Sequence, residues 1–330
     1  MIKPGAHNLI TDVDGITVGH ATDETSRSGV TSVLCATGFC AGVDVRGGGP
    51  GTRETDALAP ENLIGRAHAI VLAGGSVFGL AAADGVACAL SVQGTGIRLR
   101  DPSIAIPIVP CAVLHDLGND GNKSWGMDTP YRRLGIESVG HAATQFALGS
   151  VGAGRGAMAG LIKGGIGSSS IDLGKHIVVG ALAAVNCVGS VLMPDRKTYW
   201  SWPFEIGAEF GGRGAPAGHA SVVDPVPDQS RLSELGRLQA GANTTLAVVA
   251  CNVDLSPAEC RRIAIMAQDG IARAIRPVHT PFDGDTVFAV ASAARPLDSA
   301  TPRAAQIARI GSAAADCLAR AIARGVHHAI

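Results

Sequence analysis

The sequence predicts a layered α/β protein, in which apolar strands alternate with amphipathic helices. From about residue 242 onward, the chain reads as strand, helix, strand, helix. Hydrophobic residues make up 46% of the 330 residues and aromatic residues only 4%, so Ala, Val, Ile and Leu must fill a sizeable core. Glycine occurs 44 times without a collagen-like period, which indicates many tight turns and close backbone contacts.

The C-terminal elements carry the clearest signals. Leu246 to Cys251 is an unbroken apolar run, which is typical of a buried strand. Residues 256–259 (Ser-Pro-Ala-Glu) combine an N-cap Ser, a Pro at the first helical position and a capping-box Glu, so they begin a helix that ends before Pro277. We expect a further strand at Thr286 to Ala291 and a second helix from Thr301 to near residue 325.

The N-terminal two thirds contain similar but shorter signals. Ile70 to Ala73 predicts a strand, and a helix of small residues follows at about Val77 to Leu90. Ile104 to Leu114 contains two prolines and therefore suits an edge strand or an extended segment better than a central strand. Tyr199 to Pro227 is rich in Gly and Pro and predicts a long surface loop. Because no internal repeat or clear linker divides the chain, we expect a single domain over residues 1–330.

Charge and cysteine usage exclude several classes of protein. The 27 basic and 28 acidic residues form no basic block, so we expect no nucleic-acid partner. The N-terminal residues lack the apolar core of a signal peptide. The longest uncharged stretch, His176 to Pro194, is interrupted by Gly and Asn and reads as two strands around a turn, not a membrane span. Eight cysteines without a Cys-x-x-Cys pair predict reduced thiols in a cytoplasmic protein.

Familiar cofactor and metal motifs are incomplete. Residues 152–156 (Gly-Ala-Gly-Arg-Gly) lack the end of a dinucleotide fingerprint, and residues 121–124 (Gly-Asn-Lys-Ser) lack the adjacent Gly-Lys of a phosphate loop. The ten histidines include no His-Glu-x-x-His motif. Residues 283–285 (Asp-Gly-Asp) begin like a calcium loop, but apolar residues occupy later ligand positions. We therefore expect neither a metal nor an organic cofactor.

A run of polar residues precedes the strand at Leu246. Asn243, Thr244 and Thr245 either close the preceding turn, or the chain breaks at the Asn243–Thr244 bond and Thr244 becomes a new N-terminus. A Thr hydroxyl is a poor nucleophile unless a base accepts its proton, and the terminal amine of the same residue, with a pKa of about 7.7–8.0, can be that base. Attack of the Thr244 hydroxyl on the Asn243 carbonyl would create this amine.

Five separate stretches resemble the self-processing aminopeptidase family that contains L-aminopeptidase/D-esterase, β-peptidyl aminopeptidases and 6-aminohexanoate-oligomer (nylon oligomer) hydrolases. They extend over nearly the whole chain. The stretches are ITDVDGITVGH (10–20), GGGPGTRETD (47–56), AGGSVFGL (73–80), ANTT (242–245) and PVHTPFDGDT (277–286). The Asn-Thr-Thr form is most similar to the nylon-oligomer hydrolase branch.

The resemblance implies a four-layer αββα sandwich of the N-terminal-nucleophile-hydrolase type, a fold shared with ornithine acetyltransferase-type proteins. It also implies a precursor that cuts itself into an α chain, residues 1–243, and a β chain, residues 244–330. In this family the nucleophile is the first residue of the β chain, which corresponds to Thr244. The resemblance further implies a homo-oligomer, a tetramer of αβ units.

In the nylon-oligomer branch a Lys, an Asn and two Asp accompany the Thr, and they correspond to Lys163, Asn186, Asp283 and Asp285. We expect the Asn186 amide to donate to the tetrahedral oxyanion. Lys163 would polarise the same region or hold the Thr244 hydroxyl. One Asp would orient the Thr244 amine and the other would fix Lys163 or the loop. Without the resemblance, Asn186 and residues 283–285 also read as ordinary turn residues, and Lys163 as a solvated loop residue.

Three functions remain open. The first is an N-terminal-threonine amidohydrolase or aminopeptidase that acts on small peptides or amides, including β-peptides and ω-amino-acid oligomers. The second is an acyltransferase of the ornithine-acetyltransferase type, and the third is a non-catalytic oligomeric binding protein. Two departures bear on the first: Ala242 stands where Gly is expected before the Asn, and residues 53–56 resemble the aminopeptidase branch, so the substrate class stays open.

Overall fold

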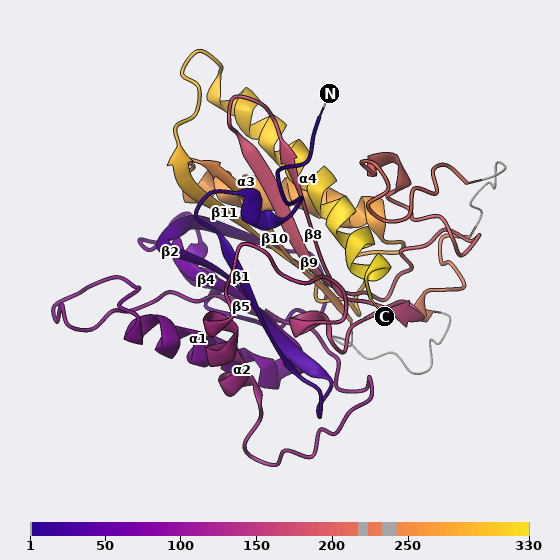
Figure 1. Cartoon of the computed structure of the whole chain (residues 1–330), viewed down its shortest axis with the longest axis horizontal. Coiled ribbons are helices and arrows are strands. Elements are labelled where there is room, and N and C mark those ends of the chain that lie inside the picture. Colours follow the sequence, from indigo (N-terminus) through magenta and orange to yellow (C-terminus); the bar gives the residue numbers. More distant parts are fainter. Residues whose placement is uncertain (1, 217–223, 233–242, 330) are drawn as a thin grey trace.

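A computed structural model of the chain describes residues 2–216, 224–232 and 243–329 (Figure 1). Its strands are β1 (Thr17–Asp23), β2 (Ser28–Val45), β3 (Thr52–Arg53), β4 (Arg66–Ala73), β5 (Cys111–Val113), β6 (Met158–Ala159), β7 (Ile162–Lys163), β8 (Ile166–Asp172), β9 (Val178–Asn186), β10 (Thr244–Val253) and β11 (Thr286–Arg295). Its α-helices are α1 (Ala81–Val92), α2 (Tyr131–Gly140), α3 (Pro257–Ala274) and α4 (Arg303–His327). Short 3-10 helices are η1 (Ile10–Asp12), η2 (Thr55–Leu58), η3 (Ser76–Leu80), η4 (Gly152–Gly154) and η5 (Trp202–Phe204).

The long strand β2 joins the two parts of the main sheet. The order of that nine-stranded sheet is β3-β5-β4-β2-β11-β10-β9-β8, with β1 also paired to β2. The first half of β2 pairs with β1 and β4, and its second half pairs with β11. The β2–β4 register shifts between Leu34 and Phe39, where Gly38 has a φ of 72°. Such an irregularity bends a strand, so the sheet folds over on itself.

Among the described residues, three hydrophobic cores lie between the layers of the fold. Alternate residues of β10 face opposite sides, as expected for a strand buried on both faces. Ala247 and Val249 pack in the core beneath α3 and α4, whereas Leu246 and Val248 pack in a central core between the two parts of the sheet. A third core lies between β4 and the α1–α2 pair. Figure 1 shows α3 and α4 on one side of the strands and α1 and α2 on the other, which confirms the αββα sandwich.

The C-terminal helices form as the sequence predicts. The Ser256 hydroxyl accepts a hydrogen bond from the Glu259 amide, and the Glu259 carboxylate accepts one from the Ser256 amide, so the capping box is formed. At Gly270 of α3, a Cβ would lie 2.3 Å from the Ala315 carbonyl oxygen of α4. The small residues of both helices therefore permit their close contact.

Two predictions for the N-terminal part need correction, and one helix has no counterpart among the predictions. Ile104 to Leu114 contributes only β5, which lies between β3 and β4 and not at the edge. His176 to Pro194 contributes one strand, β9, followed by isolated bridges, and not two strands. Helix α2 is not among the predicted elements, and its Gly135 lowers helix propensity. That glycine is needed for packing, because a Cβ would lie 2.2 Å from the Ala82 carbonyl oxygen of α1.

The segment predicted as a surface loop, Tyr199 to Pro227, is anchored in the core where the structure describes it. Tyr199 and Phe210 are buried beneath α4 and contact each other edge to face. Glu209 pairs with the buried Arg320 of α4 at 2.6 Å. Residues 217–223 of this segment lie outside the described residues. The described glycines of the segment are exposed, so it is a surface loop, as predicted, that a few buried side chains anchor to the core.

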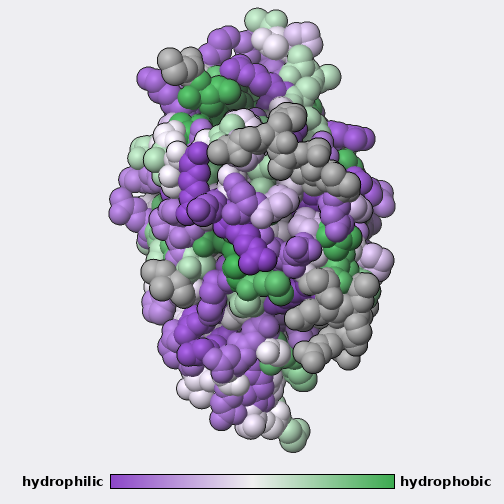
Figure 2. Space-filling model, turned by 90° about the vertical axis from the view of Figure 1, so that its right-hand side faces the viewer, coloured by the Kyte–Doolittle hydropathy of each residue, from purple (hydrophilic) through white to green (hydrophobic). Residues whose placement is uncertain are grey.

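Two features of the surface and helices concern the environment of the protein. Within the described ranges, no helix is both long enough and apolar enough to cross a bilayer. On the face drawn in Figure 2, hydrophilic residues dominate and apolar residues form separate patches.

Phe288 of β11 offers a test of the central core. Its side chain is 0% exposed between the two parts of the sheet, whereas Phe78 is 45% exposed. We expect Phe288→Ala to lower the free energy of unfolding by about 3–5 kcal/mol, because it leaves a cavity in a closed core. The matched substitution Phe78→Ala should cost less than about 1 kcal/mol. Urea unfolding followed by circular dichroism measures both, and equal losses would contradict this layer assignment.

Candidate active site

The ends of three neighbouring strands bring four of the predicted site residues together. Thr244 is the first residue of β10 and is only 1% exposed. Asn186, the last residue of β9, lies directly opposite Thr244 in the antiparallel pair. On the other side of β10, β11 runs parallel and is preceded by Asp283 and Asp285, which are both buried. The backbone of Asn243 pairs with that of Asp283.

The carbonyl oxygen of Asn243 accepts two hydrogen bonds. The Thr244 hydroxyl donates to it at an Oγ1···O distance of 2.5 Å, and the Gly284 amide donates to it at 2.9 Å. A Cβ on residue 284 would lie 2.6 Å from Thr244 Oγ1, which is too close for any ordinary contact. Glycine at this position therefore lets the backbone approach both the hydroxyl and the carbonyl.

Asp285 fixes the residue that follows Thr244. Its Oδ1 accepts a hydrogen bond from the Thr245 amide at 2.8 Å. Its Oδ2 accepts one from the His279 amide at 3.2 Å and lies 2.8 Å from His279 Nδ1. His279 was not singled out as a site residue, although it lies in the resembling stretch 277–286. A histidine six residues before an aspartate carries no local signal of this contact.

Asp283 holds the loop on the other side of the site. One carboxylate oxygen accepts from the Val188 amide at 3.2 Å, and the other accepts from the Thr280 amide and hydroxyl at 2.9 and 2.6 Å. Burial raises the pKa of Asp283 to about 6, and the nearby negative charge of Asp285 adds to the rise. The hydrogen bonds oppose this shift without cancelling it, so the uncut chain favours the protonated carboxyl group below this pH.

Asn186 is held through its side-chain amide. Its Oδ1 accepts a hydrogen bond from the Met158 amide at 3.0 Å, and its Nδ2 donates to the His115 carbonyl oxygen at 3.1 Å. An amide nitrogen carries two hydrogens, so one remains for a further acceptor. The contacts fix the plane of the amide group directly across from Thr244.

Lys163 lies near Asn186 but not in contact with Thr244. In the β6–β7 hairpin it pairs with Met158, whose amide binds Asn186. Across the described residues, no hydrogen bond or ion pair links the Lys163 side chain to Thr244 or to either Asp. Its positive charge reaches Asp120, whose pKa is lowered mainly by the Gly121 amide.

The side chain of Asn243 has a partner that sequence reasoning missed. Arg231 donates from Nη1 to Asn243 Oδ1 at 2.6 Å and from Nε to the Gly160 carbonyl oxygen at 3.0 Å. Arg231 belongs to a stretch without periodicity or motif, so nothing local distinguishes it. Ala242, which stands where Gly is expected before the Asn, lies outside the described residues.

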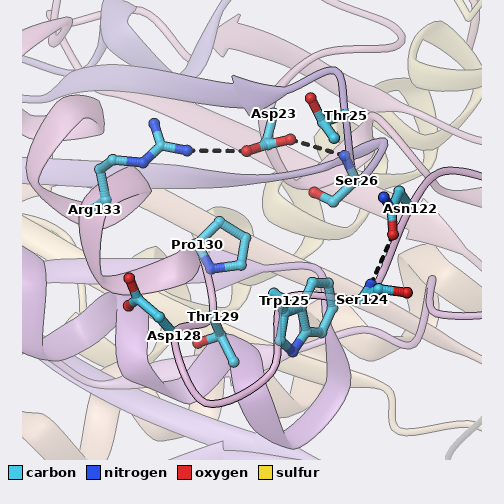
Figure 3. A pocket seen from close by; sticks show the side chains of 10 residues that line it. All are labelled: Asp23, Thr25, Ser26, Asn122, Ser124, Trp125, Asp128, Thr129, Pro130 and Arg133. Carbon is cyan, nitrogen blue, oxygen red and sulfur yellow. Dashed lines mark hydrogen bonds and ion pairs between the residues drawn. The ribbon is translucent and has the colours of Figure 1, made fainter.

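A separate pocket of about 270 Å³ lies between the β1–β2 turn and the loop before α2 (Figure 3). Arg133 and Ser26 both donate to the Asp23 carboxylate, so the charge of Asp23 is already compensated. None of the predicted site residues lines this pocket, whose lining is Asp23, Thr25, Ser26, Asn122, Ser124, Trp125, Asp128, Thr129, Pro130 and Arg133. In the part of the chain that the structure describes, no group of three or more His, Cys, Asp or Glu is placed to hold a metal ion.

Comparisons with solved structures support the fold. A Burkholderia sp. β-aminopeptidase superposes with a TM-score of 0.68 at 22% identity, covering 98% of this chain and 88% of that one. The L-aminopeptidase D-Ala-esterase/amidase of Ochrobactrum anthropi, described as a variant of the Ntn hydrolase fold, gives 0.67 at 20% identity, covering 99% and 88%. The N-terminal-nucleophile-hydrolase fold is therefore confirmed.

Sequence comparisons identify the family. An uncharacterized aminopeptidase of Mycobacterium tuberculosis is 44% identical over 337 residues, covering 98% of this chain and 94% of the relative. The 6-aminohexanoate-oligomer endohydrolase of Kocuria sp. (strain KY2) is 30% identical over 295 residues, covering 87% and 75%. Residues 8–330 match the model of peptidase family S58. These matches confirm the resemblance read from the sequence, and the chain therefore belongs to peptidase family S58, as a hydrolase of amide bonds.

Proposed function

We propose that this hydrolase is made as a precursor in which Thr244 cuts the Asn243–Thr244 bond. The products are an α chain, residues 1–243, and a β chain, residues 244–330. The observation that carries the proposal is the pair of hydrogen bonds to the Asn243 carbonyl oxygen, one from the Thr244 hydroxyl and one from the Gly284 amide. The nucleophile and an oxyanion donor thus already meet at one peptide carbonyl.

In the cleavage step, Thr244 Oγ1 attacks the Asn243 carbonyl carbon. The Gly284 amide stabilises the negative charge that develops on the carbonyl oxygen. The hydroxyl proton passes to the leaving nitrogen of Thr244 as the C–N bond breaks, which leaves an ester between Asn243 and Thr244 Oγ1. Water then hydrolyses this ester, so that Asn243 ends in a carboxylate and Thr244 carries a free hydroxyl and a free amine.

In the mature enzyme, the same oxygen attacks the substrate. The Thr244 amine takes the hydroxyl proton, Oγ1 adds to the substrate amide carbonyl, and the substrate amine leaves with a proton. Water then releases the acid from the Thr244 ester. The second hydrogen of Asn186 Nδ2 and the Gly284 amide are suited to bind the oxyanion. Asp285 keeps Thr244 in place through the Thr245 amide.

The other predicted residues act less directly in this scheme. Asp283 fixes the loop around Val188 and Thr280. Lys163 contributes positive potential from the hairpin that also orients Asn186, and not through a bond to Thr244. The amine, the hydroxyl and the peptide donors suffice for the chemistry without a cofactor.

We propose small peptides and ω-amino-acid amides as the substrate class. Relatives named as an aminopeptidase and as a 6-aminohexanoate-oligomer endohydrolase support this range. The eight free cysteines support a reducing compartment such as the cytoplasm. Exposed apolar residues support assembly into a tetramer of αβ units, among them Val77, Phe78, Val92, Leu99 and Met127.

Thr244→Ala tests the nucleophile. Intact-mass spectrometry of the purified protein should show two fragments that meet at Asn243/Thr244, whereas Thr244→Ala should give one uncut mass and no hydrolysis of aminoacyl anilides. Thr245→Ala is the matched control, because the Thr245 hydroxyl has no hydrogen-bond partner among the residues that the structure describes and should not be needed for cleavage. An active, uncut wild-type chain would refute the proposal.

Gly284→Ala tests the backbone approach. Its Cβ would displace Thr244 Oγ1 or the Gly284 amide, so we expect the rate of self-cleavage to fall by about 100-fold or more, the usual effect of losing one oxyanion donor. Gly118→Ala is the control, because a Cβ there meets no atom within 4 Å. Cleavage is followed by electrophoresis after synthesis. A Gly284→Ala chain that is cut as fast as the control would show that this geometry is not required.

Asp283 gives the uncut chain a specific pH dependence. A carboxyl group whose pKa rises from 3.8 to about 6 stabilises the folded state below its unfolded pKa, and this stabilisation is lost as the pH rises through about 6. In the Thr244→Ala background, we expect the free energy of unfolding to fall by up to about 3 kcal/mol over this range. Adding Asp283→Asn should remove that decrease. Urea unfolding at several pH values measures it, and parallel profiles would contradict the assignment.

A further inference from the structure

The proposed maturation forms an acyl-enzyme from the protein itself. Its acyl group is the asparaginyl group of Asn243, attached to Thr244 Oγ1 as the ester described above. A substrate acyl group later occupies the same position on the same oxygen. The residues around the Asn243 side chain therefore outline the subsite that receives the acyl group of a substrate.

Arg231 is the charged residue at this subsite. Its Nη1 donates to the side-chain carbonyl oxygen of Asn243 at 2.6 Å, a short and charge-assisted hydrogen bond. Asn243 itself is fully buried, so the guanidinium meets that oxygen away from bulk water. A donor in such a place favours ligands that supply an acceptor and disfavours those that leave it unpaired.

Hydrogen bonds hold Arg231 and its neighbours against other parts of the α chain, and these bonds do not depend on the Asn243–Thr244 bond that is cut. The Arg231 amide donates to the Val188 carbonyl oxygen at 2.8 Å, and its Nε donates to the Gly160 carbonyl oxygen at 3.0 Å. Next to it, the Leu161 amide donates to the Gln229 carbonyl oxygen at 3.2 Å. None of these bonds involves Asn243. They hold Arg231 in place after Asn243 has left the site.

Arg231 also belongs to the same electrostatic group as the two aspartates. The thiol of Cys187, next to Asn186, has a pKa that is raised mainly by burial. The negative charges of Asp283 and Asp285 raise it further, and the positive charge of Arg231 opposes them. The charges of Asp283, Asp285 and Arg231 thus all act on the buried Cys187. Of these three charges, that of the Arg231 guanidinium is the positive one.

We propose that Arg231 is a specificity-determining residue of the mature enzyme, and that it selects acyl groups in which two carbons separate the attacked carbonyl from a second carbonyl or carboxylate group. Asparaginyl and aspartyl amides have this spacing, as does Asn243 in the precursor. This inference rests on the proposed function, since it assumes that Thr244 is the nucleophile of both reactions. It adds the substrate class that family membership leaves open.

The wild-type enzyme tests the inference with matched substrates. Asparaginyl, aspartyl and leucyl p-nitroanilides present side chains of nearly the same shape, but the leucyl group has no oxygen. We expect kcat/KM for the asparaginyl and aspartyl compounds to exceed that for the leucyl compound by about 10-fold or more, as for the loss of a hydrogen bond to a charged group. Equal or faster leucyl hydrolysis would overturn the role of Arg231 and leave the proposed hydrolase intact. No hydrolysis of any anilide would instead count against both.

Variants then assign the preference to Arg231. In Arg231→Met, the ratio of asparaginyl to leucyl kcat/KM should fall close to one, and Arg231→Lys should retain part of it. Arg309→Met, which removes an exposed arginine of α4 that donates to the Leu173 carbonyl, should keep the wild-type ratio. Intact mass gives the matured fraction of each variant, and rates refer to that fraction. If Arg231→Met does not mature, the wild-type substrate ratios alone decide. An undiminished preference in matured Arg231→Met would overturn the proposal.

Discussion

The structure of the site depends on one peptide carbonyl, that of Asn243, and on the two hydrogen bonds that it accepts. One comes from the hydroxyl of the next residue and the other from the backbone of Gly284. The first hydrogen bond requires Thr244 at the start of β10. The second requires a residue without a side chain, Gly284, in the segment that passes beside Asn243. Both conditions are met because β10 and β11 run parallel and the turn before β11 passes beside Asn243. The long strand β2 supports this arrangement, because it holds β11 from the opposite side.

Buried carboxylates supply the rest of the framework. Asp283 and Asp285 accept hydrogen bonds mainly from backbone amides, namely those of Val188, Thr280, Thr245 and His279. Such bonds fix the position of the backbone on both sides of Thr244. They leave two acidic groups close together in a poorly solvated place, which explains the raised pKa of Asp283. The proposed cleavage at Thr244 would add a terminal amine to this site, a group that the uncut chain lacks.

Local patterns predict the parts of this molecule that depend on neighbours in sequence. The capping residues of α3, the apolar run of β10 and the stretches at 242–245 and 277–286 are short-range signals. They identify the C-terminal elements, the family and three of the clustered residues, namely Thr244, Asp283 and Asp285. The bend at Gly38, the helix α2 and the roles of His279 and Arg231 come from contacts between distant segments. Gly135 shows how local sequence patterns and distant contacts can conflict. It weakens the helical signal of α2, and it also permits the helix to pack. The position of Lys163 comes from the resemblance, and the structure connects it to Thr244 only through Met158 and Asn186.

The position of β10 inside the sheet has a consequence for the processed protein. After the proposed scission, β10 would remain hydrogen-bonded to β9 of the other polypeptide on one edge, while β11 would remain bonded to β2. The shorter polypeptide would thus be interleaved with the longer one and would stay bound without a covalent link. Once denatured, however, the two would have to find each other by diffusion. Refolding would become a second-order process that depends on concentration. The lifetime of the cleaved protein would then be set by the rate at which it unfolds and its two polypeptides dissociate.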